Sequence, residues 1–358
     1  MSFHEIIIAV MAGFAVLGAL DRIFGNRWGL GKEFEEGILA MGSLALAMVG
    51  IVSLAPVLAQ VLKPVVVPLF GFLGADPAMF AGTILACDMG GGALALQMTD
   101  NQEAAMLGGV LNGSMLGATI VFTIPVAMGI LREQDRPAMA KGILCGIVTI
   151  PLGLLAGGIA AGFSLRMVLR NLIPIVLIAV LIALGLWRAE RTMVKGFSLF
   201  GRFVIVLVTV GLVAAIVEAL TGFVIIPGMA PISEGFETVG TIAILLAGAF
   251  PLVFVLTKLL RNPLMAVGRK LGINDAAAAG LIASLANSIA TFGMVKDMNE
   301  RGKVINIAFA VSAAFVFGDH LGFTAGFAPE MIGPMIVGKL VGGISAVIVA
   351  LWLTRRDI

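Results

Sequence analysis

The chain has 358 residues, of which 60% are hydrophobic and 12% are charged, and its formal net charge at pH 7 is +2. Because soluble domains carry roughly a quarter charged residues, this composition excludes a soluble globular protein and predicts a polytopic protein of the lipid bilayer. A net charge this close to zero gives no reason to expect a nucleic-acid partner.

Eleven apolar segments follow one another along the chain. Each approaches or exceeds the roughly 20 apolar residues that a membrane-spanning helix needs. They cover residues 3–24, 37–62, 79–98, 105–131, 142–163, 171–188, 202–222, 236–257, 276–295, 304–326 and 333–354. Strands of a membrane barrel would alternate polar and apolar residues over much shorter runs, so we expect an all-α fold.

The sequence matches itself when it is shifted by 198 residues. FEEGILAMG at 34–42 aligns with ISEGFETVG at 232–240, and 15 of the 49 positions from 36 to 84 are identical to their partners. Internal repeats of this kind underlie many transporter folds. We therefore expect a first repeat at 1–163, a linking span at 164–200 and a second repeat at 201–358.

The distribution of Lys and Arg between the segments predicts how the chain crosses the membrane. If all eleven segments span, the better orientation places 12 of these residues on one side and 10 on the other. If segments 79–98 and 276–295 are instead re-entrant hairpins, the two sides carry 19 and 3, as the positive-inside rule requires. We therefore expect about nine transmembrane helices plus two hairpins. An odd number of spans per repeat makes the second repeat inverted, and the order of elements is similar to that of elevator-type carriers.

Two further features occur once in each repeat. The amphipathic stretches 63–74 and 261–272, one before each hairpin, are expected to lie at the membrane interface. Glu36 and Glu234 begin their helices, where negative charge suits the helix dipole. We expect these two glutamates to be structural.

One charge and three glycines interrupt the first hairpin, in ILACDMGGGAL at 84–94. A charged side chain at the centre of a spanning helix costs roughly 2.5–3.5 kcal/mol on insertion scales, so its presence suggests a function. We expect Asp88 and Gly90 at the tip of this hairpin, and Asn287 and Ser288 at the equivalent tip of the second. Substrate sites of repeat-built carriers lie where such elements meet near the midplane. The alternative is a protonated Asp88 that hydrogen-bonds hairpin backbone.

Three other polar residues lie within predicted spans. Asp319 and His320, in FGDHLGF at 317–323, are candidates for substrate binding or proton relay. The alternative is a pair at a helix end near the membrane interface, in which the two side chains hydrogen-bond each other or the backbone. Asn112 is a candidate hydrogen-bond partner of the substrate, or else a polar contact between close-packed helices. The two cysteines and two histidines are too scattered to predict a metal site, so we expect no metal and no cofactor.

Several long strings resemble one known family. FEEGILAMGSLALAMVG at 34–50, MFAGTILACDMGG at 79–91 and FVFGDHLGFTAG at 315–326 are similar to the EutH family, the ethanolamine transporters of ethanolamine-utilisation operons. The resemblance covers nearly the whole chain. It implies a multi-pass protein of the bacterial inner (cytoplasmic) membrane that brings ethanolamine to cytoplasmic lyase metabolism, and a transporter rather than an enzyme.

Ethanolamine is a small cation that fits a buried anionic site. Asp88 would hold its ammonium group, and Asn112 or Asn287 would hold its hydroxyl. Inward movement of a cation is already favoured by roughly 2.3 kcal/mol per 100 mV, so we expect a facilitator that works by alternating access.

The alternatives are a proton- or sodium-coupled carrier of another small amine or a nucleoside, an intramembrane enzyme and a pore. An aspartyl protease of the presenilin type is disfavoured because the chain has no tyrosine for a Tyr-Asp motif. Elevator-type carriers often form homo-oligomers, which this sequence neither requires nor excludes.

Overall fold

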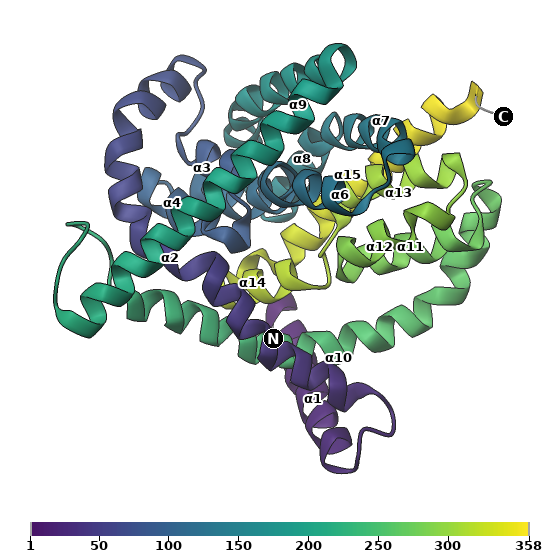
Figure 1. Cartoon of the computed structure of the whole chain (residues 1–358), viewed down its shortest axis with the longest axis horizontal. Coiled ribbons are helices and arrows are strands. Elements are labelled where there is room, and N and C mark those ends of the chain that lie inside the picture. Colours follow the sequence, from purple (N-terminus) through teal and green to yellow (C-terminus); the bar gives the residue numbers. More distant parts are fainter. Residues whose placement is uncertain (1, 357–358) are drawn as a thin grey trace.

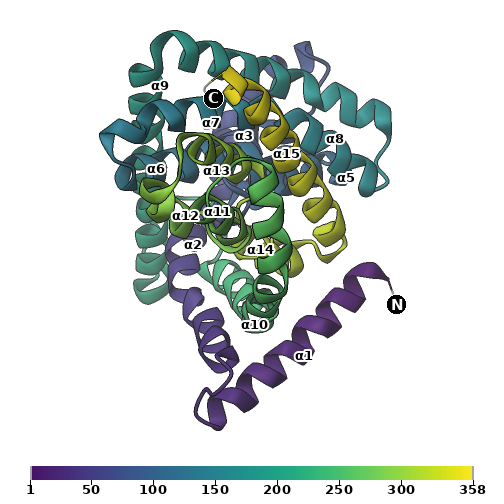
Figure 2. The same ribbon diagram turned by 90° about the vertical axis from the view of Figure 1, so that its right-hand side faces the viewer.

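The computed structural model describes residues 2–356, and in this range the chain is helical without any strand. Seven helices of this range are long and apolar enough to cross a membrane. They are α1 (Phe3–Ile23), α2 (Leu30–Phe72), α9 (Leu165–Thr221), α10 (Ile232–Lys270) and the composite helices Gln102–Ile130, Glu133–Ala160 and Pro329–Leu353. The prediction of an all-α polytopic membrane protein is confirmed. Helix α1 projects from the body that the other helices form (Figure 2).

The difference of four between the eleven predicted segments and these seven helices has two sources. One predicted pair of spans lies within the single long helix α9, and the segments 79–98, 276–295 and 304–326 consist of shorter helices. The predicted spans 171–188 and 202–222 are two helical segments of α9, which meet at a kink at Ala189, where φ is −144° and ψ is 46°. Helices α2 and α10 continue through most of the amphipathic stretches 63–74 and 261–272. The stretches predicted at the interface are therefore extensions of apolar helices and not separate elements.

The three composite helices each change type along their length. Gln102–Ile130 consists of α5 (Gln102–Ala105), the π-helices η2 (Met106–Gly117) and η3 (Thr119–Thr123), and α6 (Ile124–Ile130). Glu133–Ala160 consists of η4 (Glu133–Asp135), α7 (Arg136–Ile147) and α8 (Ile150–Ala160). Pro329–Leu353 consists of η6 (Pro329–Met331) and α15 (Ile332–Leu353), and η7 (Thr354–Arg356) follows it. Since π-helical turns are rare and frequent at functional sites, η2 is a region of interest.

Each predicted hairpin consists of two short helices that pack against each other. Extended residues and the 3₁₀ turn η1 (Cys87–Met89) separate α3 (Ala78–Ile84) from α4 (Gly91–Met98). Extended Asn287 separates α11 (Asp275–Ala286) from α12 (Ser288–Met294), and η5 (Val295–Asp297) follows. The two helix pairs lie on opposite sides of Figure 1, with α14 (Asp319–Phe327) between them. Non-helical backbone at membrane depth is tolerated only where it is buried in protein or lines a cavity.

The predicted span 304–326 is wrong as a single helix, because the chain breaks between α13 (Glu300–Ala313) and α14. Within the break, Phe315 adopts the left-handed backbone region, with φ 63°. The end of α11 stabilises this conformation, since the N–H of Phe315 donates to the carbonyl of Ser284 at 3.0 Å. Gly318 is required there because a Cβ would overlap the last carbonyl oxygen of α11. These contacts between distant segments are invisible in an apolar pattern.

Helices α2 and α10 end in the same way at equivalent positions of the two repeats. Gly74 and Gly272 both adopt the left-handed region, with φ 69° and 72°. In both places the N–H of the next residue, Ala75 or Ile273, donates to a carbonyl of the last helical turn. This is the Schellman geometry, for which glycine is the usual residue. The sequence match at these positions therefore extends to the backbone conformation.

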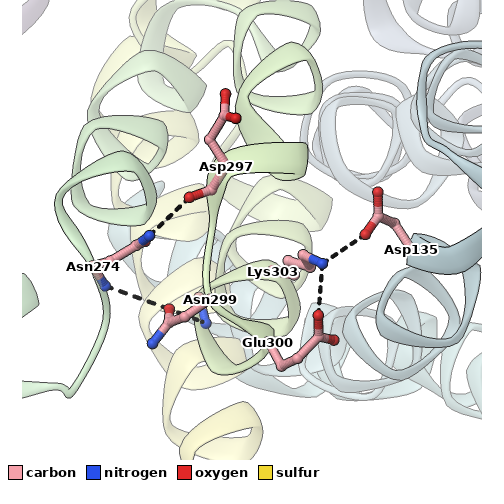
Figure 3. A network of polar contacts seen from close by, with 7 residues as sticks. Asp135, Asn274, Asp297, Asn299, Glu300 and Lys303 are labelled. Atoms are coloured by element: carbon pink, nitrogen blue, oxygen red, sulfur yellow. Dashed lines mark hydrogen bonds and ion pairs between the residues drawn. The ribbon is translucent and has the colours of Figure 1, made fainter.

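A buried ion pair joins α13 to the start of α7. The ammonium of Lys303 lies 2.7 Å from Asp135 and 2.6 Å from Glu300 (Figure 3). The side chains of Lys303 and Asp135 are only 8% and 1% exposed. Close by, the side-chain amide of Asn274 donates to the carbonyl of Asp297 at 2.8 Å. These contacts tie the start of α11 to the chain after α12, and α13 to its neighbour α7.

Candidate functional site

Two chain breaks meet around one small cavity, which we call the chamber. The breaks after α3 and α13 bring Asp88, Asp319 and His320 to its wall, together with the rings of Phe122 and Phe315. Its volume is about 30 Å³. A water molecule takes roughly 30 Å³ in the liquid, so the chamber has space for about one water.

Asp88 and His320 face each other in the chamber. Nε2 of His320 lies 3.8 Å from a carboxylate oxygen of Asp88, and the two side chains are 3% and 17% exposed, respectively. This distance exceeds hydrogen-bonding range, and the two groups form an ion pair only when the imidazole is protonated. The other ring nitrogen, Nδ1, is buried and has no hydrogen-bond partner among the described residues. A ligand in the chamber would therefore meet the carboxylates of Asp88 and Asp319 and the imidazole of His320.

The tip of the first hairpin depends on glycine at position 90. Gly90 has a φ of 86°, which glycine adopts at no steric cost, and a Cβ at this position would overlap the side chain of Ile51. Gly90 lines a second cavity, of about 380 Å³, together with Glu234. We call this cavity the Glu234 pocket.

Asp319 lies where the chamber meets a third cavity. It lines both the chamber and a cavity of about 360 Å³ that also contains Glu36 and that we call the Glu36 pocket. Asn287 lines this pocket, and its side-chain oxygen accepts a hydrogen bond from the N–H of Ile289 at 2.7 Å. Ser288 is fully buried, and its hydroxyl has no partner in the described part of the chain. The two predicted tips therefore lie at neighbouring cavities that share Asp319.

Asn112 is enclosed between helices. Its amide nitrogen donates to the carbonyl of Met79 at 3.3 Å and to the hydroxyl of Thr83 at 3.1 Å. Its amide oxygen is buried, without a hydrogen-bond partner in residues 2–356. Because these bonds fasten η2 to α3, the arrangement favours the packing role of Asn112 over the substrate role.

Lys339 is a buried ionisable residue that is not among the site residues predicted from the sequence. Its side chain is 1% exposed, its Nζ donates to the carbonyl of Ser114 in η2, and it lies within electrostatic range of Asp88. The signal in the sequence is a lysine inside the apolar segment 333–354, because ionisable residues in spans are functional by default. The buried centre thus contains an amine of the chain itself near the carboxylate of Asp88.

Three potential metal ligands also come together beside the chamber. One ligand atom each of Cys87, Asp88 and His320 lies within 4.8 Å of the others. Thiolate, carboxylate and imidazole suit zinc, although structural zinc sites usually have four protein ligands. In its protonated form, the nearby Lys339 would oppose the binding of a metal cation. Sequence spacing did not predict this cluster because His320 is contributed by a distant segment.

Known proteins resemble this chain over its full length. The family model described as "Ethanolamine utilisation protein, EutH" matches residues 3–353. A Listeria monocytogenes protein named "Probable ethanolamine permease EutH" is 60% identical, over 99% of this chain and 95% of its own length. A Salmonella typhimurium protein of the same name is 48% identical, over 100% of this chain and 97% of its own length. The "Uncharacterized protein YxeR" of Bacillus subtilis is 51% identical, over 99% of this chain and 96% of its own length.

No solved structure matches the chain. The family match across nearly all of its residues and the identities of 48–60% to full-length relatives lead to one conclusion. The chain belongs to the EutH family of ethanolamine utilisation proteins.

Proposed function

We propose that this chain is a transporter of ethanolamine in the bacterial inner (cytoplasmic) membrane, and not an enzyme. The observation that carries the proposal is the buried pair of Asp88 and His320, held between helix breaks in a polytopic membrane protein. An anionic site at such a break suits a small cation. The relatives named probable ethanolamine permeases support the same substrate.

Ethanolamine has two polar ends, and the chamber has partners for both. The carboxylate of Asp88 accepts hydrogen bonds from the ammonium group, with Asp319 as a second anion on the chamber wall. The hydroxyl pairs with the unpartnered Nδ1 of His320, or with Asn287 toward the Glu36 pocket. An amine without a hydroxyl leaves a buried polar group unpaired, which is the kind of contact that discriminates strongly between substrates.

The chamber must widen before ethanolamine can enter it. Its volume of about 30 Å³ is that of roughly one water, whereas ethanolamine has two carbons, a nitrogen and an oxygen. In an elevator-type cycle, the helix pairs α3–α4 and α11–α12 move past the long helices and expose the site to each side in turn. The 198-residue repeat and the matching ends of α2 and α10 support the two related halves that this cycle needs.

The membrane potential alone can drive this uptake. A monovalent cation gains roughly 2.3 kcal/mol for each 100 mV when it enters the negative interior. A facilitator without a coupled ion is therefore sufficient. Uptake that follows the potential and is indifferent to imposed proton or sodium gradients is the expected result in proteoliposomes.

The direct test replaces Asp88 by Asn. Loss of one partner of a buried charge pair costs roughly 2–5 kcal/mol, so uptake at low ethanolamine concentration should fall at least about 30-fold. Asp100→Asn is the matched control, because Asp100 is an exposed residue after the same hairpin. Its uptake should equal that of the unchanged protein. If a folded Asp88→Asn protein transports ethanolamine normally, this site is not where the substrate binds.

A further inference from the structure

Corresponding residues of the two repeats line the two larger cavities. The Glu234 pocket and the Glu36 pocket have volumes of about 380 and 360 Å³. The equivalent lining residues, which are 198 positions apart, are Val52 and Phe250, Ala55 and Val253, and Glu234 and Glu36. This separation is the offset of the sequence repeat. The two pockets are therefore two copies of one structural feature.

Where α2 and α10 cross, the contacts between the two repeats are reciprocal. Gly37 of α2 packs on the backbone of Ala247 of α10, and Gly235 of α10 packs on Val49 of α2. Exchange of the equivalent positions of the two repeats converts one contact into the other. Such reciprocal contacts characterise a two-fold relation. A two-fold axis through this crossing would exchange the two pockets. The crossing lies in the lower half of Figure 1, above the turn between α1 and α2.

The chamber lies between the two pockets. Asp319 lines both the chamber and the Glu36 pocket. On the other side, Met89 lines the chamber, and the next residue, Gly90, lines the Glu234 pocket. The stacked rings of Phe323 and Phe327, with centroids 4.9 Å apart, also line the Glu234 pocket. A path from one pocket to the other therefore passes the tip of the first hairpin and the chamber.

The Glu36 pocket suits a small organic ammonium ion. The carboxylates of Glu33, Glu36 and Asp319 line it together with phenyl rings. One of these rings, that of Phe254, has a primary ammonium over its face, because Nζ of Lys258 lies 4.0 Å from the ring centroid. Carboxylates and aromatic faces both attract ammonium groups, the second through cation–π interaction. The Glu234 pocket contains an equivalent of one of these carboxylates, because Glu234 corresponds to Glu36.

We propose that the two pockets are the opposite vestibules of one permeation path for small primary ammonium ions, with Glu36 and Glu234 in equivalent roles. The Glu234 pocket faces the outside and the Glu36 pocket the cytoplasm, since the Glu36 pocket lies beside Lys258, one of the 19 Lys and Arg residues on the predicted inner side. This inference rests on the proposed transport function. It gives the two glutamates a role beyond the structural one expected from their helix positions.

The test uses one cysteine in each vestibule. Thr238 lines the Glu234 pocket and Thr257 lines the Glu36 pocket, and each is replaced by Cys in separate proteins. A membrane-impermeant thiol reagent that carries a quaternary ammonium is applied to intact cells or to inverted vesicles. Thr238→Cys should react and lose ethanolamine uptake only in cells, and Thr257→Cys only in inverted vesicles. Excess ethanolamine should slow both reactions several-fold. The unsubstituted protein is the control, because Cys87 and Cys145 are buried.

The readouts separate this inference from the transport function. Modification is followed by mass as well as by uptake, so it is measured in inactive protein too. If both cysteines react from the same side while uptake before labelling is normal, the vestibule assignment is overturned and ethanolamine transport stands. If uptake is absent from the unsubstituted protein, the proposed function fails, whatever the labelling pattern.

Discussion

At the scale of single residues, the unusual feature is a concentration of ionisable groups in one apolar region. Asp88, Asp319 and His320 line the chamber, and Lys339 interacts electrostatically with Asp88. A buried charge is tolerated only when it is paired or hydrogen-bonded. We therefore expect Lys339 to balance the carboxylates while the carrier is empty, and ethanolamine to add its own charge when it is bound.

Replacement of Lys339 by Met tests this role. Methionine has a similar length, so the packing is largely kept, but Asp88 loses its resident counter-charge in the empty state. An uncompensated buried charge costs several kcal/mol, so the return of the empty carrier should slow and net uptake should fall at least about tenfold. Exchange of labelled for unlabelled ethanolamine, in which the carrier returns loaded, should be much less affected. Equal losses of net uptake and exchange would contradict the counter-charge role.

At the scale of elements, interrupted helices position the site, and contacts between distant segments hold these interruptions. The break after α13 docks on the end of α11, and the ion pair of Lys303 with Asp135 fastens α13 to the start of α7. The exposed Glu300 adds a second partner for Lys303. Surface ion pairs contribute roughly 0–1 kcal/mol. The buried contact is the one whose loss should be costly, because it leaves an unpaired buried charge.

The buried ion pair makes a prediction about stability. Lys303→Met leaves Asp135 charged and unpaired, which should destabilise the protein by roughly 3–5 kcal/mol and lower the temperature of thermal unfolding in detergent. The double variant Lys303→Met with Asp135→Leu should recover most of this loss, because no buried charge remains. Glu300→Gln, which removes only the exposed partner, should melt close to the unchanged protein. A double variant as unstable as Lys303→Met would argue against an electrostatic origin.

At the scale of the whole molecule, the two-fold relation between α2 and α10 bears on topology. The reciprocal packing of Gly37 and Gly235 is expected if the two repeats have opposite orientations in the membrane. The loops after the two hairpins then lie on opposite sides. If both hairpins are re-entrant, the charge count of 19 against 3 predicts that the loop after the second hairpin lies in the cytoplasm.

Single cysteines in these loops test the inverted topology. Asp100 and Lys296 are exposed, and they follow the first and the second hairpin, respectively. An impermeant thiol reagent added to intact cells should label Asp100→Cys and spare Lys296→Cys until the membrane is permeabilised. Labelling of both without permeabilisation would mean that the second hairpin spans, and the repeats would then be parallel.

The sequence allows part of the candidate site to be predicted. Asp88, Asp319 and His320 stand out because each is a charged or titratable residue in an apolar run, and the structure places all three at the chamber. Asn112 has the same kind of signal, yet it bonds to α3. A single polar residue in a span has the same appearance whether it faces a cavity or a neighbouring helix, so only packing distinguishes these cases.

The sequence by itself determined the membrane class and the helical content, and it predicted the internal repeat and the two hairpins. These features depend on composition, segment length and periodicity, which are local properties. Only the tertiary structure decided that segment 304–326 breaks and that Lys339 lies near Asp88. It alone also showed that equivalent residues line two pockets. Each of these features depends on contacts between segments far apart in the chain, and an apolar pattern contains no information about such contacts.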